Sequence, residues 1–246
     1  MLEQLSAWFE GVKAEFILNF VEKNRWKMLV TGLENTLIIT FFALLIGMAI
    51  GVVMTVVRTT RDQTRQGKRG VGSALLAVAD AICRIYTTVI RGTPVVVQLM
   101  IMYFIIFASS DNGVMIAIVA FGLNSGAYVS EIFRGGILAV DKGQMEAGRS
   151  LGLNYLQTML HVIAPQVLKN VLPTLANEFI VLIKETSVAG YVAVMDLTFA
   201  GNRIRGATYS AFMPLIAVAL IYLVLVMFLT WLVGKLERRL RQGDNR

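Results

Sequence analysis

The chain is poor in the residue types on which most enzymes and metal proteins rely. It contains one cysteine, Cys83, and one histidine, His161, among 246 residues. An intrachain disulfide and a Cys/His zinc cluster are therefore excluded, and a Ser/His or Cys/His catalytic arrangement would have to use His161. The sequence also lacks a Gly-x4-Gly-Lys-Ser/Thr phosphate loop, so any ATP that this protein depends on is hydrolysed elsewhere.

Charge is scarce as well. Only 16% of the residues are charged and 56% are apolar, against roughly 25% and 45–50% in an ordinary soluble domain. A helix of about 20 apolar residues crosses the roughly 30 Å hydrocarbon core of a membrane. Charge-free stretches of at least 19 residues cover 35–57, 92–110, 112–130 and 206–234.

A fifth apolar stretch, 171–195, contains Glu178, Lys184 and Glu185. We count it as a span because apolar residues flank these charges and because five spans give a consistent charge distribution. The expected fold class is therefore all-α, a polytopic membrane helix bundle, with a transmembrane domain over 31–240. The spans are expected at about 33–57, 75–108, 113–133, 171–195 and 210–234.

The positions of Lys and Arg predict the orientation of this bundle. With five spans, the segments 58–69, 134–170 and 235–246 share one side and carry fourteen bases, whereas the other side carries six. The positive-inside rule places the basic side in the cytoplasm, so the N-terminus is expected outside and the C-terminus inside. The basic excess then reports orientation, and nucleic acid is not an expected partner because no basic run is interleaved with aromatic residues.

Residues 1–30 are expected to form an extracytoplasmic, amphipathic segment rather than a cleaved signal peptide. Apolar residues recur at helical spacing, while Glu10, Lys13 and Glu15 face elsewhere. The pattern favours a helix lying on the outer membrane surface, and a loosely ordered tail is the alternative. The apolar positions are Leu5, Trp8, Phe9, Val12, Phe16 and Phe20.

The second span has an unusual sequence. A helix over Leu75–Ile90, with Asp80 and Arg84 at i,i+4, meets Arg91-Gly92-Thr93-Pro94 before the apolar stretch Val95–Ala108. Proline removes a backbone donor, so this point either bends the helix or breaks it. A break inside a membrane is tolerated where the freed backbone groups are buried in protein or face a watery cavity.

The segment 141–170 is the longest polar segment between spans and has its own helical pattern. Gln144–Leu151 is expected as a short helix that Gly152 ends, and an apolar face then continues to Ile163 until Pro165 interrupts it. Such a helix-turn-helix either packs under its own bundle or presents a rigid surface to another protein.

Several motifs in this region resemble a known family. Glu146-Ala147-Gly148, then Gly152 and Pro165, resemble the EAA loop of importer-type ABC transporter permeases, with Gly148 in place of the second Ala. Val162 and Ala164 stand where the family pattern has Ile and Leu. Other motifs resemble the histidine and glutamine permeases among the polar amino-acid transporters; these are Arg91-Gly92-Thr93-Pro94, Ala127-Tyr128-Val129-Ser130-Glu131, Lys142-Gly143-Gln144 and Asn177-Glu178-Phe179.

The resemblance implies a multi-pass permease in a bacterial plasma (inner) membrane that translocates a polar amino acid. It would pair with a second permease, identical or related, over two ATPase subunits that bind ATP and Mg, and an extracytoplasmic binding protein would deliver the substrate. This chain itself would be a transport subunit without a cofactor or metal, not an enzyme. The residues implied to couple it to the ATPase are Glu146, Ala147, Gly148, Gly152 and Pro165.

Charged groups inside the spans are the candidates for substrate contact. An ionised side chain there costs at least about 2.5–3.5 kcal/mol, so it should face the bundle interior, a partner or water. Lys184 is expected to pair with a neighbouring acid, and Glu131 with Arg134 at i,i+3. An amino acid needs acceptors for its ammonium and donors for its carboxylate, and both are offered near the middle of the fifth span by Glu185, Thr186 and Ser187.

Permeases of this kind place substrate contacts in the same region, with Gln98 and Asp196 as further candidates. Arg91 either meets a substrate carboxylate or snorkels to the membrane surface. Four glycines, Gly47, Gly51, Gly122 and Gly126, are expected to pack helices together, and the G-x-x-x-G pair Gly47 and Gly51 would also suit an interface between two permeases.

Two other classes of protein remain open. An ion-gradient-driven secondary transporter or a channel would also have several spans and buried charges, but it usually shows internal repeats and needs no long cytoplasmic hairpin. An intramembrane enzyme would need a nucleophile with a base or a set of metal ligands.

Overall fold

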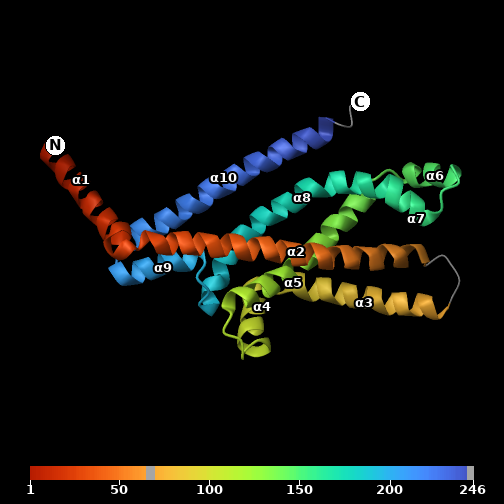
Figure 1. Cartoon of the computed structure of the whole chain (residues 1–246), viewed down its shortest axis with the longest axis horizontal. Helices are drawn as coiled ribbons and strands as arrows, with labels where there is room; N and C mark the ends of the chain where they lie inside the picture. The colour runs from red at the N-terminus through yellow and green to blue at the C-terminus, as the bar shows by residue number, and fades with distance from the viewer. Residues whose placement is uncertain (65–69, 243–246) are drawn as a thin grey trace.

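The structure is a computed structural model that describes residues 1–64 and 70–242, and within these ranges all regular structure is helical (Figure 1). Part of the predicted basic loop, with Arg65, Lys68 and Arg69, lies outside the described residues, as does Arg246. The helices are α1 (Leu2–Phe16), α2 (Trp26–Thr64), α3 (Val71–Gly92), α4 (Val95–Ile101), α5 (Gly113–Leu138), α6 (Lys142–Ser150), α7 (Tyr155–Thr158), α8 (Ala164–Glu185), α9 (Leu197–Thr208) and α10 (Phe212–Gln242).

Four of the described helices are long and apolar enough to cross a membrane: α2, α3, α5 and α10. The predicted second span, 75–108, is not one helix. The chain leaves the helix after Gly92, and Thr93 and Pro94 are both extended before α4 begins at Val95. Proline has no N–H and disfavours helical backbone at the residue before it, so the helix ends here instead of bending.

The predicted span 171–195 also differs from the observed helix. α8 starts earlier, at Ala164, and ends at Glu185, where a 3-10 segment, Thr186–Val192, leads to a left-handed Ala193. Because of its charges, α8 is not among the four helices that are apolar enough to count as candidate membrane spans. The α-helix therefore ends before the predicted span does, because a run of apolar residues does not distinguish a long helix from a helix followed by a buried turn.

The segment between α5 and α8 turns sharply at Gly152, whose φ of 86° lies in the left-handed region. Leu153 N–H donates to Gly148 O at 3.2 Å and Gly152 N–H donates to Arg149 O at 3.1 Å. This pair of bonds is the Schellman arrangement, which satisfies carbonyls at the end of α6 and favours glycine at the turn.

Pro165 does not interrupt the next helix, contrary to the prediction. α7 continues through a π-helical turn, Met159–Ile163, directly into α8, and Pro165 lies in the first turn of α8. The Ala164 N–H bonds to Met159 O in the wider π pattern, which gives room for a residue that cannot donate and whose ring crowds the preceding turn. One helical column therefore runs from Tyr155 to Glu185.

Small residues hold α2 against α5. A Cβ on Gly47 would lie 2.8 Å from Ser125 Oγ, and one on Gly51 would lie 2.5 Å from Val129 Cγ1. Added Cβ atoms on Gly122 and Gly126 would reach Ile46 and Ile50 in return, each at 2.8 Å. The predicted packing role of these glycines is confirmed, and the G-x-x-x-G pair packs within the chain.

The N-terminal segment forms a helix, α1, that projects from the bundle (Figure 1). Trp8, Phe9 and Phe16 on α1 are exposed, whereas Phe20 is buried against α9 and α10 residues. Arg25 donates to the carbonyl of Leu18, and Thr208 donates to Asn19 at 2.7 Å. These polar contacts attach the base of α1 to the bundle, where the chain turns at two left-handed residues, Lys23 and Asn24.

The arrangement of the helix ends separates two poles of the molecule (Figure 1). The end of α2, the start of α3, the segment α6–α7 and the C-terminal end of α10 lie at one pole. The opposite pole holds α1, α9 and the start of α10. The described parts of the three segments that share one side in the charge count therefore also lie at one end of the fold.

Candidate functional site

The first candidate region is the hairpin formed by α6 and α7. Glu146 and Ala147 are exposed on α6, whereas Gly148 is buried against α7. A Cβ at Gly148 would lie 2.5 Å from Thr158 Cγ2 and 3.3 Å from Thr158 Cβ, so only glycine allows the two helices to lie this close. This contact explains why Gly148 stands where the family pattern has alanine.

Local hydrogen bonds fix the position of Thr158. Asn154 and Gln157 form a capping box, with reciprocal bonds of 2.9 Å between side chain and backbone. Thr158 is fully buried, and its hydroxyl donates to Asn154 O at 3.0 Å. The hairpin is therefore rigid on its inner face, while its outer face exposes three large apolar side chains, those of Leu151, Leu156 and Leu160.

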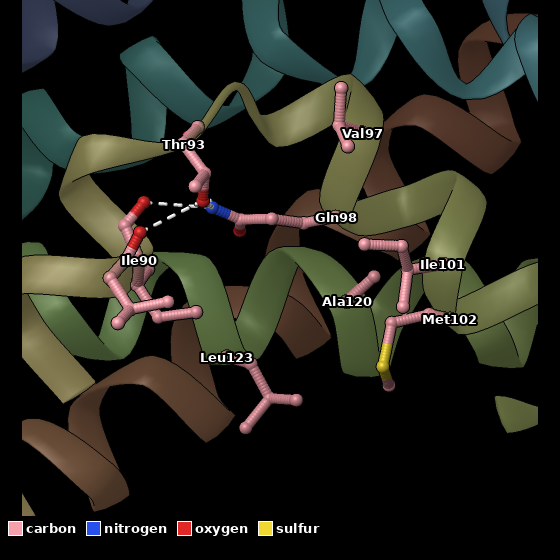
Figure 2. Close-up of a pocket in the computed structure, with 9 residues that line it drawn as sticks. Ile90, Thr93, Val97, Gln98, Ile101, Met102, Ala120 and Leu123 are labelled. Carbon is pink, nitrogen blue, oxygen red and sulfur yellow. Dashed lines mark hydrogen bonds between the residues drawn. The ribbon is translucent and has the colours of Figure 1, made fainter. Parts of the chain in front are cut away.

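The second candidate region is the corner where α3 breaks and α4 begins. Gln98 reaches back across this corner, and its Nε2 donates to Ile90 O at 2.7 Å, Thr93 Oγ1 at 2.8 Å and Thr93 O at 3.1 Å (Figure 2). Its Oε1 accepts from Asn124 Nδ2 on α5 at 2.9 Å. One amide therefore satisfies backbone carbonyls freed by the break and ties the corner to α5.

A cavity of about 260 Å³ opens beside Gln98. Its walls come from α3, α4 and α5, and its lining is mostly apolar (Figure 2). The predicted choice between a bend and a cavity-lining break is thus decided for the break. The cavity is lined by Val89, Ile90, Thr93, Val97, Gln98, Ile101, Met102, Ala120 and Leu123.

Arg91 lies one turn from this corner and is exposed. Its guanidinium carbon is 5.5 Å from the centroid of the Tyr128 ring, a cation–π contact that orients the side chain across α5. No ion pair of Arg91 occurs in the described part of the chain. Its charge is therefore available to an anionic group.

The other predicted substrate residues follow the end of α8. Glu185 is half-buried, and Thr186 is fully buried with its hydroxyl donating to Ile183 O at 2.8 Å. Ser187 lines a different pocket, of about 400 Å³, together with Tyr191 and with Asn202 of α9. This turn and α4 meet in one apolar cluster, which contains Leu99, Leu182 and Ala189. The turn after α8 and the corner at Gln98 are therefore neighbours.

Asp196, a further candidate for substrate contact, lies at the start of α9. It is fully buried and caps α9, accepting from Thr198 N–H at 2.8 Å and from Phe199 N–H at 3.2 Å. Both carboxylate oxygens are used by the helix end, as is typical for an N-cap aspartate. The structure therefore shows Asp196 supporting α9, and its contact with a substrate stays a prediction.

A buried hydrogen bond between polar side chains of α5 and α8 was not predicted from the sequence. Glu178 accepts from Ser125 at 3.0 Å. Lys184 is exposed and forms no ion pair in the ranges that the structure describes, but its charge acts on the neighbouring Glu185, so its pairing with an acid stays a prediction. The Glu131–Arg134 pair is confirmed at 2.7 Å. The only available signal was the polar dipeptide Asn124-Ser125 inside an otherwise apolar span.

Fold and site together are those of a membrane-type subunit, a helical bundle with an exposed hairpin at one pole and a mostly apolar cavity beside Gln98 at the broken corner. Comparisons with known proteins make this more specific. Residues 70–242 match the family described as binding-protein-dependent transport system inner membrane component. The chain belongs to this family, whose members are transport components of ABC systems and not enzymes.

Curated relatives match over nearly their whole length. The arginine transport system permease protein ArtQ of Bacillus subtilis is 37% identical over 88% of this chain and 94% of its own. The glutamine transport system permease protein GlnP of Escherichia coli K12 is 35% identical over 87% and 93%.

Two solved structures have the same fold. The crystal structure of an amino acid ABC transporter with histidines superimposes with a TM-score of 0.77 at 35% identity, covering 89% of this chain and 98% of that one. An inward-facing structure of the MetNI methionine ABC transporter reaches a TM-score of 0.72 at 23% identity, with the same coverage, and supports the fold alone.

Proposed function

We propose that this chain is the membrane-spanning subunit of an ATP-driven importer of a polar amino acid in a bacterial inner membrane. The observation that carries the proposal is the helical column Tyr155–Glu185. Its 31 residues span about 45 Å and join the hairpin that carries Glu146 to the turn that carries Glu185. A displacement of the hairpin would therefore reach the cavity region through one stiff element.

The proposed topology has five crossings, with the N-terminus outside and the C-terminus in the cytoplasm. α8 is the crossing that hydropathy does not select, and it runs between the two poles beside α2 and α5 (Figure 1). Its charges are compatible with a membrane because Glu178 faces Ser125 in the interior. Residues 1–30 would then be an outer segment, with α1 on the membrane surface, 31–240 the transmembrane domain and 141–170 the cytoplasmic coupling loop.

The proposed coupling region is the hairpin, where Glu146, Ala147, Gly152 and Pro165 are exposed and Gly148 packs between the two helices. ATP and Mg would be bound by a separate ATPase subunit that docks there. Two copies of that subunit, a second permease and an extracytoplasmic binding protein would complete the transporter. The exposed leucines of α6 and α7 support a protein partner, since Leu151 is 83% exposed in this chain alone.

The proposed substrate contacts are Gln98 and Arg91 on one side and Glu185, Thr186 and Ser187 on the other. Arg91 can meet the carboxylate of an amino acid, and Glu185 can meet its ammonium. The apolar cluster that joins α4 to the 3-10 turn keeps these groups in register. Arginine and glutamine, the substrates named for the relatives, both have the polar side chain that such a site would accept.

Co-purification tests the assignment most simply. The chain would be co-expressed with a candidate ABC ATPase subunit from the same genome, and the expected result is a stable complex whose ATPase activity rises with substrate-loaded binding protein. Glu146→Lys should weaken this complex, while Glu10→Lys on α1, an exposed charge reversal at the other pole, should leave it intact. A permease that binds no ATPase and transports with an ion gradient alone would contradict the proposal and favour a secondary transporter.

A further inference from the structure

Charged side chains from α2, α3 and α5 gather at the pole that carries the hairpin. Arg58 of α2 contacts Glu131 of α5 at 2.6 Å, and Arg134 contacts the other oxygen of Glu131 at 2.7 Å. On α3, Arg84 contacts Asp80 at 2.9 Å. The side chains of Arg58 and Asp80 are only 15% and 11% exposed, so these are not simply solvated surface pairs.

Asp80 is incompletely paired in this conformation. Its Oδ2 accepts from Arg84, whereas its Oδ1 is buried and has no hydrogen-bond partner in the described part of the chain. A buried carboxylate oxygen without a donor is destabilising and rare in folded proteins. The orphaned oxygen therefore indicates that Asp80 has a partner in another arrangement of the helices.

Arg58 is the donor that fits. Its guanidinium has five N–H groups, and within the part of the chain that the structure describes only Nη1 is engaged, by Glu131. The bond of 3.0 Å between Arg61 Nη1 and Ser73 Oγ sets the register of the antiparallel helices α2 and α3. Counting about 1.5 Å per residue from that bond places Arg58 and Asp80 about 6 Å apart along the helix axes, within reach of an arginine side chain.

A common neighbour supports this placement. Cys83, one turn from Asp80, lies within the electrostatic influence of both Asp80 and Arg58. Arg58 of α2 therefore lies near the turn of α3 that carries Asp80 and Cys83.

The helices differ in how firmly they are held. α2 and α5 are interlocked at Gly47, Gly51, Gly122 and Gly126, which leaves no space for sliding. Most α3 side chains are exposed. In the residues that the structure describes, the Tyr86 hydroxyl donates to Leu123 O of α5, and Arg61 of α2 donates to Ser73. α3 can therefore move against a rigid α2–α5 pair.

We propose that Asp80 accepts a hydrogen bond from Arg58 in the other access state of the transporter, so that the pair latches α3 against α2 and α5 at the hairpin pole. Arg58 then bridges Asp80 and Glu131 and links three helices through one guanidinium. The latch rests on the proposed function, because it requires the two access states of an ATP-driven importer. Asp80 and Arg58 are positioning residues in this scheme and do not touch the substrate.

The test measures the distance between α2 and α3 in the assembled transporter. Cys83 is replaced by serine, and spin labels are attached at Val56→Cys on α2 and Val78→Cys on α3. Both positions are 59% exposed and lie five residues from the Arg61–Ser73 bond, so they are at about the same level along the two helices. Electron paramagnetic resonance then records distances in liposomes without nucleotide and after trapping with ATP and vanadate. A shorter distance should dominate in one of the two states.

Asp80→Asn should lower the ratio of shorter to longer distances about tenfold, in the range typical of coupling between sites. Asp62→Asn, which removes an exposed carboxylate from the same end of α2, should preserve the ratio. Arg58→Lys keeps a charge for Glu131 but lacks the fork that bridges two carboxylates, so it should also lose the shorter distance. It serves as the second variant where Asp80→Asn does not assemble.

An Asp80→Asn transporter with wild-type distances in both states would overturn the latch. So would a wild-type transporter that imports its substrate with one unchanged distance, and in that case the proposed function would stand. A wild-type complex whose ATPase does not respond to substrate-loaded binding protein would instead overturn the proposed function and the latch with it.

Discussion

Gly148→Ala should weaken the coupling between ATP hydrolysis and transport, and the structure explains by how much. The new Cβ would lie 2.5 Å from Thr158 Cγ2, whereas carbon atoms prefer about 3.5–4.0 Å. Thr158 cannot turn away, because it is fully buried and its hydroxyl is bonded to Asn154 O. α6 must therefore move about 1 Å from α7 to restore the contact distance.

Overpacking of this kind costs about 1–3 kcal/mol. If this cost falls on the docked form of the hairpin, the stimulation of ATP hydrolysis by substrate-loaded binding protein should fall about 5- to 150-fold. The assay compares ATPase stimulation by substrate-loaded binding protein with amino-acid uptake in liposomes, for wild type and variant. Gly135→Ala is the matched control, since a Cβ at Gly135 on α5 meets no atom within 4 Å.

A compensating change separates this cause from general damage. Thr158→Ser removes Cγ2 and keeps the hydroxyl that bonds to Asn154 O, so Gly148→Ala with Thr158→Ser should recover most of the stimulation. Wild-type coupling in Gly148→Ala alone would refute the reasoning. Failure of the double variant to recover, while Thr158→Ser by itself is normal, would show that Gly148 acts through something other than this contact.

Three further predictions concern the same regions. Gly152→Ala forces an L-residue into the left-handed region and should lower the free energy of unfolding by about 1–2 kcal/mol. The variant should melt at a lower temperature than Gly135→Ala. Equal melting temperatures would contradict the predicted backbone strain at residue 152. Glu146→Lys should keep the wild-type melting temperature, because this exposed side chain has no ion pair or hydrogen bond within the described ranges. The same variant should abolish ATPase stimulation, and retained stimulation would remove Glu146 from the interface. Gln98→Leu leaves Asn124 without its acceptor at the broken corner. The KM for uptake should rise at least about tenfold, in line with a lost buried hydrogen bond. An unchanged KM would exclude Gln98 from the substrate site.

Much of the fold follows from apolar runs and from individual Gly and Pro residues. The charge-free stretches place α2, α5 and α10, and Gly152 predicts the turn after α6 because few other residues adopt a positive φ. Thr93-Pro94 predicts that the helix bends or breaks at this point. Its consequence was not predictable, because apolar residues on both sides of the break fit one long span as well as two separate helices.

Local rules failed where position along the helix decides the outcome. Pro165 reads as a helix breaker, but in the first turn of α8 its missing N–H has few consequences, and the π-helical turn before it accommodates the ring. Asp196 reads as a buried charge near the substrate residues, and it is also the cap of a short helix that the apolar pattern did not reveal.

The parts of the site that sequence reasoning missed are contacts between distant segments. Gln98 and Asn124 are 26 residues apart, and Ser125 and Glu178 are 53 apart, so no local pattern connects either pair. The fit of Gly148 to Thr158 depends on the turn between their helices. Such pairs become visible only when the packing of the helices is known.

Uptake of a labelled polar amino acid into liposomes tests the central claim most directly. The liposomes would contain this permease with its ATPase subunits, ATP enclosed on the ATPase side and substrate-loaded binding protein on the other. The account predicts accumulation that requires ATP hydrolysis and stops with vanadate. Accumulation without ATP, driven by an imposed proton or sodium gradient, would contradict it.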